Sequence, residues 1–347
     1  MKQKKRRMAA ALIGCMLLGS LPAGCKKESV SIDAAVEETT LGSLGEETIS
    51  LEEAVFYTRM LQEQWEYTYY EYYGADMWQE QVDEETGTLA DALKRDVLDA
   101  LTEIHLLCAH AEEFGVELSS EERSVLAERA KAFMEQNTPE VLEAAGATEE
   151  RVEAFLTRNQ LAAKVSDAVQ ESCEPEVDEE AARVGKLTYA LFATTGIFDA
   201  EGNQTPFTEE ELIQVKENAI AFAARAKELG DISAAGEEVS HTLIDVYFND
   251  ETDGGAHELV AEAARGLEVG GISELVETEE GYYIVQRVSA YDEEASRENI
   301  EAQKERIKAS YYGKVLESWK EETPLELEEA LWDTVQIDGM LTEPAGL

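Results

Sequence analysis

The sequence predicts an α+β protein, in which a helical N-terminal domain precedes an inserted α/β domain and a returning C-terminal helix. Between residues 50 and 165 apolar residues recur every three or four positions, which is the period of amphipathic helices. The run KLTYALFATTG at 186–196 instead alternates and is rich in β-formers, which is typical of a strand. Helical spacing returns over residues 293–322, so the α/β part is expected to interrupt a helical domain.

The first 24 residues have the pattern of a signal peptide. Five basic residues at 2–7 precede a short apolar run, and small residues then lead into Cys25. The apolar run is shorter than the about 20 residues that cross a hydrocarbon core. The sequence LPAGC at 21–25 resembles the lipobox of bacterial lipoproteins, although proline stands where leucine is usual. The resemblance implies lipidation of Cys25 after removal of residues 1–24; a cleaved signal with an incidental cysteine is the alternative.

The charge of the chain excludes one class of partner. The sequence has 29 Lys and Arg against 75 Asp and Glu, a formal net charge of −46. Removal of residues 1–24 takes away five basic residues and no acid, which leaves 24 − 75 = −51. Nucleic-acid binding needs a basic footprint, so no nucleic-acid partner is expected. Only Cys108 and Cys173 follow Cys25, too few for a disulfide-stapled scaffold, and whether they pair stays open.

A helical domain is expected over residues 48–173, after a flexible tether at 25–47 that lacks any period. Its first helix covers 50–73 and begins with a capping box formed by Ser50 and Glu53. One face of this helix carries residues at spacings of four, four, four and three: Tyr57, Leu61, Trp65, Tyr69 and Tyr72.

Three more helices complete the predicted helical domain. The second covers 88–114, with Gly115 as the expected C-cap. Ser119 and Glu122 open a third helix, and Thr148 opens a fourth whose apolar residues are expected to point inward.

The inserted domain is expected over residues 178–292. Its predicted elements are a strand at 186–196, a helix at 209–229, a strand-like piece at 241–248, a helix at 256–267, and strands at 273–278 and 282–289. The charged helix at 293–322 is then expected to pack on the helical domain, and residues 323–347 are expected to form a C-terminal tail.

The run GLEVGGISELVETEEGYYIVQRV at 266–288 resembles the C-terminal half of a parvulin-type peptidyl-prolyl cis-trans isomerase domain. Residues 209–229 match the first long helix of that family. Together with the N-terminal helices, the lipobox and the returning helix, the chain resembles PrsA-type foldase lipoproteins and the chaperone region of SurA. The resemblance implies an FKBP-like superfold for the inserted domain.

The chemistry implied by this resemblance is the twisting of an X-Pro amide over a barrier of about 20 kcal/mol. An apolar pocket and a hydrogen-bond frame must favour the twisted amide over the planar one. Parvulins build the frame on two facing histidines, and these positions fall on Tyr189 and Tyr283. Tyrosine is neutral at pH 7 and still donates and accepts hydrogen bonds. Whether isomerase activity survives the loss of both imidazoles stays open.

The other parvulin positions are matched in part. Thr278 fits the threonine of the family and Asp245 is a candidate for its acid. Val260 stands near the place of the pocket phenylalanine, and Val260 and Ile272 are candidates for substrate binding. The usual Gly-Gly-x-Leu-Gly-Trp-Phe stretch is absent. His257 is interpreted as solvent-facing or as reaching the isomerase groove.

The run WEYTYYEYYGADMW at 65–78 is the most aromatic part of the chain. Its rings are either core residues or part of a surface for client polypeptides. Tyr67, Tyr70 and Tyr73 fall off the apolar face, and exposed aromatic residues with polar tips suit loose binding of unfolded segments. No His and Cys pattern with metal-ligand spacing is present, so neither a metal nor another cofactor is expected.

These patterns predict a foldase or chaperone for exported proteins, held by lipid on the outer face of a bacterial cell membrane. Unfolded or newly exported polypeptides are the expected partners, with weak isomerase activity as a further possibility. A non-catalytic chaperone or scaffold with an inactive parvulin domain is the first alternative. A solute-binding lipoprotein is the second, although the two-lobed α/β pattern of that class is not seen.

Overall fold

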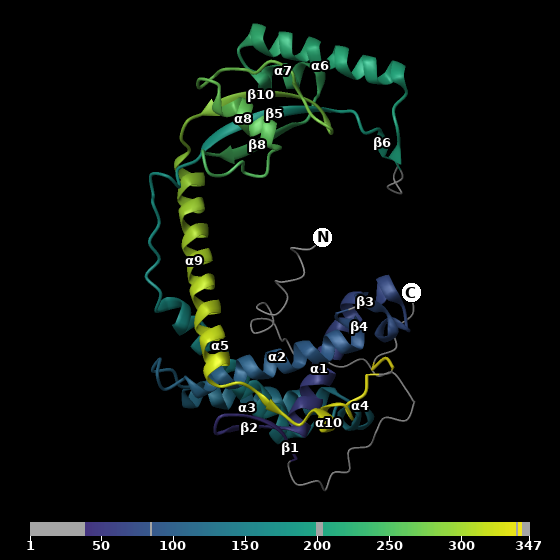
Figure 1. The fold of residues 1–347 in the computed structure, drawn as a ribbon, viewed down its shortest axis with the longest axis vertical. Helices are drawn as coiled ribbons and strands as arrows, with labels where there is room; N and C mark the ends of the chain where they lie inside the picture. Colours follow the sequence, from purple (N-terminus) through teal and green to yellow (C-terminus); the bar gives the residue numbers. More distant parts are fainter. Residues whose placement is uncertain (1–38, 84, 199–203, 338, 342–347) are drawn as a thin grey trace. The chain divides into compact units, whose positions relative to one another are not determined.

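The computed structural model describes residues 39–83, 85–198, 204–337 and 339–341 (Figure 1). The chain divides into two compact units: unit 1 consists of residues 1–174 and 308–347, and unit 2 of residues 175–307. The predicted inserted domain at 178–292 falls within unit 2. The predicted signal peptide, Cys25 and the tether up to residue 38 lie outside the described residues. Within the described ranges, no helix is long and apolar enough to cross a membrane.

Helices form most of unit 1, and the predicted residues Ser50, Ser119 and Thr148 are the N-caps of three of them. Their bounds are α1 Leu51–Tyr73, α2 Leu89–Ala109, α3 Ser120–Gln136, α4 Pro139–Ala144 and α5 Glu149–Glu171. The Ser50 hydroxyl accepts from the backbone N–H of Glu53 at 3.1 Å, but the predicted capping box is incomplete, because the Glu53 carboxylate contacts His105 and Arg158 instead. The second helix ends at Ala109 instead of residue 114. The residues that follow form turns up to Gly115, whose φ of 64° lies in the left-handed region. The six residues of α4 were not predicted.

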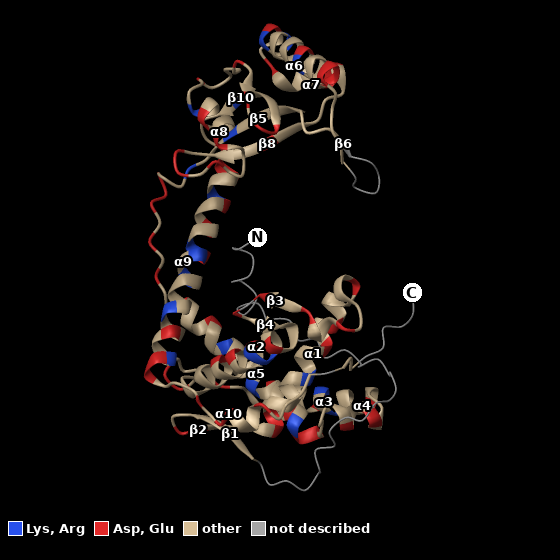
Figure 2. Cartoon of the chain, turned by 45° about the vertical axis from the view of Figure 1, so that its right-hand side comes forward, with Lys and Arg blue, Asp and Glu red and all other residues tan. Residues whose placement is uncertain are grey.

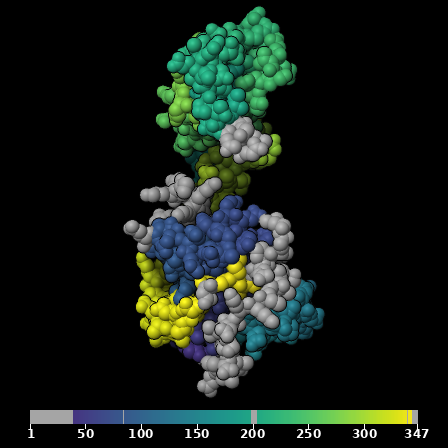
Figure 3. All heavy atoms as spheres, turned by 90° about the vertical axis from the view of Figure 1, so that its right-hand side faces the viewer, coloured from purple at the N-terminus to yellow at the C-terminus, as the bar shows by residue number. Residues whose placement is uncertain are grey.

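Residues expected to be a tether and a tail form a small sheet in unit 1. Strands β1 (Thr40–Leu44), β2 (Glu47–Ser50) and β11 (Glu326–Leu327) pair in the order β11-β1-β2. The expectation for these residues was wrong because Leu41, Leu44 and Ile49 are buried in the core. The helix α10 (Glu329–Trp332) follows, and Figure 3 shows this last segment in yellow against the blue and purple residues of the same unit.

Buried Glu66 holds the end of the C-terminal segment on α1. Its carboxylate accepts hydrogen bonds from Trp78 Nε1 at 3.2 Å and from the backbone N–H of Leu341 at 3.0 Å. Gln62 Nε2 bridges Glu66, at 2.9 Å, and the carbonyl oxygen of Gly339, at 2.8 Å. Hydrogen bonds to a buried carboxylate are stronger than neutral ones, so these contacts fix the segment firmly. The short pieces η3 (Met77–Gln79), β3 (Gln81–Asp83) and β4 (Gly87–Thr88) lie between α1 and α2.

Unit 2 is built on a four-stranded sheet in the order β8-β5-β10-β9. The strands are β5 Gly185–Ala193, β8 Leu243–Phe248, β9 Val276–Glu277 and β10 Gly281–Ser289, and a separate hairpin joins β6 Ile197–Phe198 to β7 Gln204–Thr205. The helices are α6 Glu209–Leu229, α7 Ile232–Val239 and α8 Glu258–Arg265, and α9 (Glu293–Glu322) runs from unit 2 into unit 1. Helices α6 and α9 have the predicted bounds, whereas α7 was not predicted.

The two faces of this sheet have separate apolar cores. On one face Ala190 and Ile284 pack with Phe222 of α6 and Ile232 of α7. On the other face Leu187, Val285 and Tyr283 pack with residues of α8. The division follows from the alternation of side chains along β5 and β10, since successive residues of a strand point to opposite faces.

Cys108 and Cys173, whose pairing the sequence left open, are both free. Cys108 is half-buried on α2, and its thiol donates to the carbonyl oxygen of Arg158 at 3.5 Å. Burial raises the pKa of this thiol to about 11, so it stays protonated at neutral pH.

We predict that Glu63 makes unit 1 less stable as pH rises. Burial and the neighbouring Glu66 raise the pKa of Glu63 to about 7, so the folded chain holds a proton that the unfolded chain has lost. The free energy of unfolding should therefore fall between about pH 4.5 and 7. Solvent reaches this carboxylate, so Glu63→Gln should gain only about 1 kcal/mol over the wild type at pH 8 and little at pH 5.

Urea denaturation followed by tryptophan fluorescence measures this, because all four tryptophans lie in unit 1. The matched control is Glu71→Gln, an exposed glutamate on the same helix. Equal behaviour of the two variants at both pH values would contradict the prediction.

Candidate functional site

The aromatic rings of Tyr189 and Tyr283 face each other on the side of the sheet that α8 covers. In the β5–β10 register Tyr283 is opposite Leu191 and Val285 is opposite Tyr189, so both tyrosines point to one face. Their ring centroids are 5.2 Å apart with an interplanar angle of 62°, an edge-to-face contact. Tyr283 is buried and Tyr189 is partly exposed. The sequence left open whether Tyr189 and Tyr283 face each other. In the structure their rings are in contact.

The Tyr283 hydroxyl donates a hydrogen bond to Glu280 Oε2, in the turn between β9 and β10. Burial, followed by this bond and the negative charge of Glu280, raises the pKa of Tyr283 far above its ordinary value. Burial and Glu280 also raise the pKa of Tyr189. Both phenols are therefore neutral at physiological pH and act as hydrogen-bond donors, not as bases.

An imidazole lies beside the tyrosine pair, at His257. Its ring centroid is 6.3 Å from that of Tyr283. The residue is the N-cap of α8, and its Nδ1 accepts from the backbone N–H of Leu259 at 3.2 Å. Its Nε2 lies 3.4 Å from Glu279 Oε2. Of the two interpretations of His257, reaching the groove is the one that the geometry supports, but both ring nitrogens already have partners.

The other predicted site residues do not all join this pair. Val260 of α8 is buried against Tyr283 in the same apolar core. Thr278 closes the β9–β10 turn, where its hydroxyl accepts from the backbone N–H of Glu280 at 3.1 Å. It therefore shapes the turn that carries Glu280.

The structure corrects the expectation for Asp245 and Ile272. Asp245 of β8 is opposite Thr188, whose hydroxyl donates to its Oδ1 at 2.6 Å, and it forms an ion pair with Lys186 at 2.7 Å. Ile272 packs with the α6 and α7 core. Both residues thus belong to the face opposite Tyr189, because the register of β5 decides which neighbours share a face.

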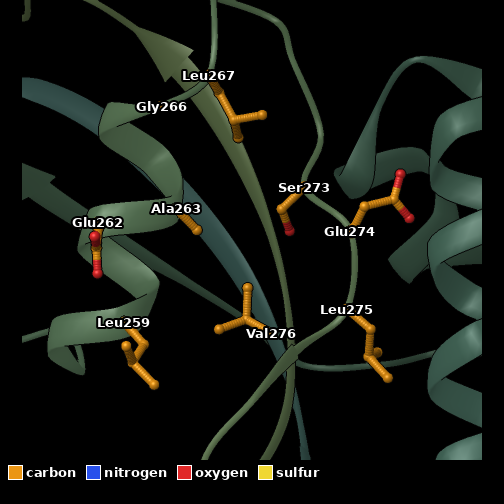
Figure 4. Close-up of a pocket in the computed structure, with 9 residues that line it drawn as sticks. All are labelled: Leu259, Glu262, Ala263, Gly266, Leu267, Ser273, Glu274, Leu275 and Val276. Atoms are coloured by element: carbon orange, nitrogen blue, oxygen red, sulfur yellow. The ribbon is translucent and has the colours of Figure 1, made fainter.

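A shallow groove of about 460 Å³ runs beside α8 (Figure 4). Figure 4 shows α8 as one wall and the segment from Ser273 to Val276 as the other. The groove is mainly apolar, and its lining residues are Leu259, Glu262, Ala263, Gly266, Leu267, Ser273, Glu274, Leu275 and Val276. Val276 is opposite Tyr283 in the sheet, so the groove lies next to the tyrosine pair.

The last turns of α1, in unit 1, carry a second set of exposed aromatic residues, which point to different sides of the helix. Tyr67 is 91% exposed, Tyr72 79% and Tyr73 49%, whereas Tyr70 is only half-exposed. The sequence placed Tyr72 on the apolar face, but Tyr72 is exposed and this face ends at Tyr69, which is partly buried. We call Tyr67, Tyr72 and Tyr73 the α1 tyrosine patch.

Comparison with known proteins finds no family model and no curated protein that matches this chain. Among solved structures, the PrsA foldase of Lactococcus lactis is 14% identical, with 86% of this chain and 100% of that one covered and a TM-score of 0.38. A PrsA peptidylprolyl isomerase of Bacillus cereus is 15% identical over 86% and 99% of the two chains, with a TM-score of 0.33.

A structure from Campylobacter jejuni, described as a SurA-like chaperone, is 9% identical over 83% and 98% of the two chains, with a TM-score of 0.30. The chain is similar to PrsA foldases and SurA-like chaperones. These are the proteins that the sequence resembles. At such identities and TM-scores the similarity carries no argument about activity, which must come from the residues of this chain.

We predict that the two site tyrosines contribute unequally to the stability of unit 2. Tyr283→Phe removes the donor to Glu280 and should cost about 1 kcal/mol. Tyr189→Phe should change the free energy of unfolding by less than about 0.5 kcal/mol, because this partly exposed phenol can bond water. Native-state hydrogen exchange of the β5 and β10 amides measures both variants. Equal costs would contradict this assignment of hydrogen bonds.

Proposed function

We propose that this protein is an extracytoplasmic foldase of the PrsA type, which binds unfolded or newly exported polypeptides and has little or no isomerase activity. The observation that carries the proposal is the Tyr189–Tyr283 pair, at the two positions where the resembled parvulins have facing histidines. Two surfaces of the described residues are candidates for binding a polypeptide. One is the α1 tyrosine patch of unit 1. The other is the tyrosine pair of unit 2 with the groove beside α8, which we call the tyrosine cleft.

The cleft of unit 2 suits an extended apolar segment. Ile244 of β8 is opposite Tyr189 in the sheet and is 43% exposed, and Leu259 of α8 is also 43% exposed. Apolar side chains of a client would remove this surface from water, at about 25 cal/mol for each Å² that is buried. The hydroxyl of Tyr189 offers a hydrogen bond to a peptide carbonyl beside it.

The same geometry opposes efficient isomerisation. Acceleration needs donors that bind the twisted amide better than the planar one. The Tyr283 hydroxyl is already bonded to Glu280, and the imidazole of His257 caps α8 and contacts Glu279. A substrate amide must compete with these bonds, so the site is better suited to holding a segment than to twisting it. If isomerase activity is absent altogether, the protein is a non-catalytic chaperone with an inactive parvulin domain.

Attachment to the membrane is the part of the proposal that rests on sequence alone. Cys25 follows a signal-like segment and lies outside the described residues. Two acyl groups would hold the protein stably on a membrane, whereas a single acyl group binds only marginally. An acylated Cys25 as the mature N-terminus, found by mass spectrometry, tests this part.

We expect the α1 tyrosine patch to carry chaperone activity. Changing Tyr67, Tyr72 and Tyr73 to serine should reduce suppression of client aggregation at least about three-fold, because the exposed rings supply the apolar contact area. Their exposure means that the thermal midpoint should stay within a few degrees of the wild type. Light scattering of a chemically denatured client measures the effect.

The matched control changes three other exposed tyrosines to serine: Tyr247, Tyr291 and Tyr311. This variant should suppress aggregation as the wild type does. Equal losses in the two variants would mean that general surface aromaticity, and not the patch, binds clients.

We expect the wild type to accelerate proline isomerisation little above the uncatalysed rate. A protease-coupled assay on an Xaa-Pro-Phe peptide measures this. The variants Tyr283→His and Tyr189→His/Tyr283→His replace the phenols by imidazoles, and the double variant should raise the rate by about an order of magnitude or more. Strong acceleration by the wild type would show that a phenol pair suffices and would refute the proposed weak activity.

A further inference from the structure

The tyrosine cleft has an acidic rim. Glu279 and Glu280 lie in the β9–β10 turn and are exposed, and each carboxylate contacts a ring of the cleft, His257 and Tyr283 respectively. Glu262 is exposed on α8 and lines the adjoining groove. Acidic residues, red in Figure 2, occur throughout both units, so the rim matters only if it differs from the rest of the surface.

The difference is the apolar groove beside these acids, since Lys and Arg leave the rim unneutralised just as they leave other exposed acids of unit 2, such as Glu210 and Glu217. Six Lys and Arg residues occur between positions 185 and 289, and each has a partner other than Glu262, Glu279 or Glu280, although two of these partners, Glu274 and Leu267, also line the groove. Lys186 pairs with Asp245, Lys216 with Glu277, Arg225 with Glu228 and Glu238, Lys227 with Glu274, Arg265 with Asp253, and Arg287 with the Leu267 carbonyl and the Phe248 ring.

Among the described residues, no ion pair with Lys or Arg reaches Glu262, Glu279 or Glu280. The pKa of Glu279 lies below its usual range, first because of a backbone hydrogen bond and then because of His257, so this carboxylate is ionised at neutral pH. Unneutralised charges beside an apolar groove raise the local concentration of cations, because the low-dielectric wall focuses their field.

We infer that this cleft, if it binds polypeptide as proposed above, selects extended segments in which Lys or Arg flanks apolar residues. The apolar side chains occupy the surface of Tyr189, Ile244 and Leu259, and the cation lies at Glu279 and Glu280. An acidic segment is excluded, because its carboxylates meet an unneutralised rim.

The test measures fluorescence anisotropy of three labelled peptides with the full-length protein. Each peptide has a Leu-Pro-Phe core, and the flanking residues are Lys, Gln or Glu. At low ionic strength the Lys peptide should bind about three- to ten-fold more tightly than the Gln peptide, and the Glu peptide more weakly still. The preference should shrink at 300 mM salt, where charges are screened over a few Å.

The variant Glu279→Gln/Glu280→Gln should remove most of the preference for the Lys peptide. The amide oxygen of the second substitution keeps an acceptor for Tyr283, so the turn is retained, and an unchanged thermal midpoint verifies this. The matched control is Glu210→Gln/Glu217→Gln, which removes the same charge from two exposed glutamates of α6. This control should keep the preference.

The outcomes separate the inference from the proposed function. Equal losses in the two variants would overturn the inference, because the attraction would come from the net charge of the whole chain. Equal binding of the Lys and Gln peptides would overturn the selectivity and leave polypeptide binding intact. Failure of all three peptides to bind would overturn both.

Discussion

The antiparallel pairing of β5 with β10 is the constraint on which unit 2 depends. Its register places Tyr189, Tyr283 and Val285 on the face of α8, and Ala190 and Ile284 on the face of α6 and α7. A slip of one residue would exchange these sets and bury the phenols under α6. Gly281 begins β10 with a φ of 150°, and a Cβ there would lie 2.3 Å from the carbonyl oxygen of Phe192. The pairing thus decides both the cores and the cleft.

Helix α6, whose ends are stabilised by residues close by in the sequence, was predicted with the correct bounds. Helix α6 begins at its capping box of Thr208 and Glu211 and ends at Gly230, whose φ of 68° suits a C-cap. Such signals lie within a few residues of the helix end, and they explain why the helix keeps the predicted bounds of 209–229. The helices α4 and α7 have six and eight residues, too few for an apolar period to stand out.

Elements that depend on distant partners were not predictable in this way. Gly42 of β1 is opposite Leu327 of β11, and a five-residue strand paired with a two-residue strand has no period of its own. Dependence on distant strand partners also explains why only some of the predicted site residues lie together. Tyr189 and Tyr283 came from matches of motif, whereas the grouping of Asp245 and Ile272 with them required the face of each strand, which only the register provides.

The hydrogen bonds around the tyrosine pair satisfy its buried polar group and determine the charge beside it. A buried phenol needs a partner, and Glu280 supplies one at the turn beside the ring. That partner is anionic, so the phenol stays protonated and the turn carries a charge toward any bound chain. Tyr283 and Glu280 thus combine a phenol whose hydrogen bond is already made with a fixed negative charge. In the foldase proposed above, this arrangement favours binding of the side chains of a client over catalysis at its peptide bond.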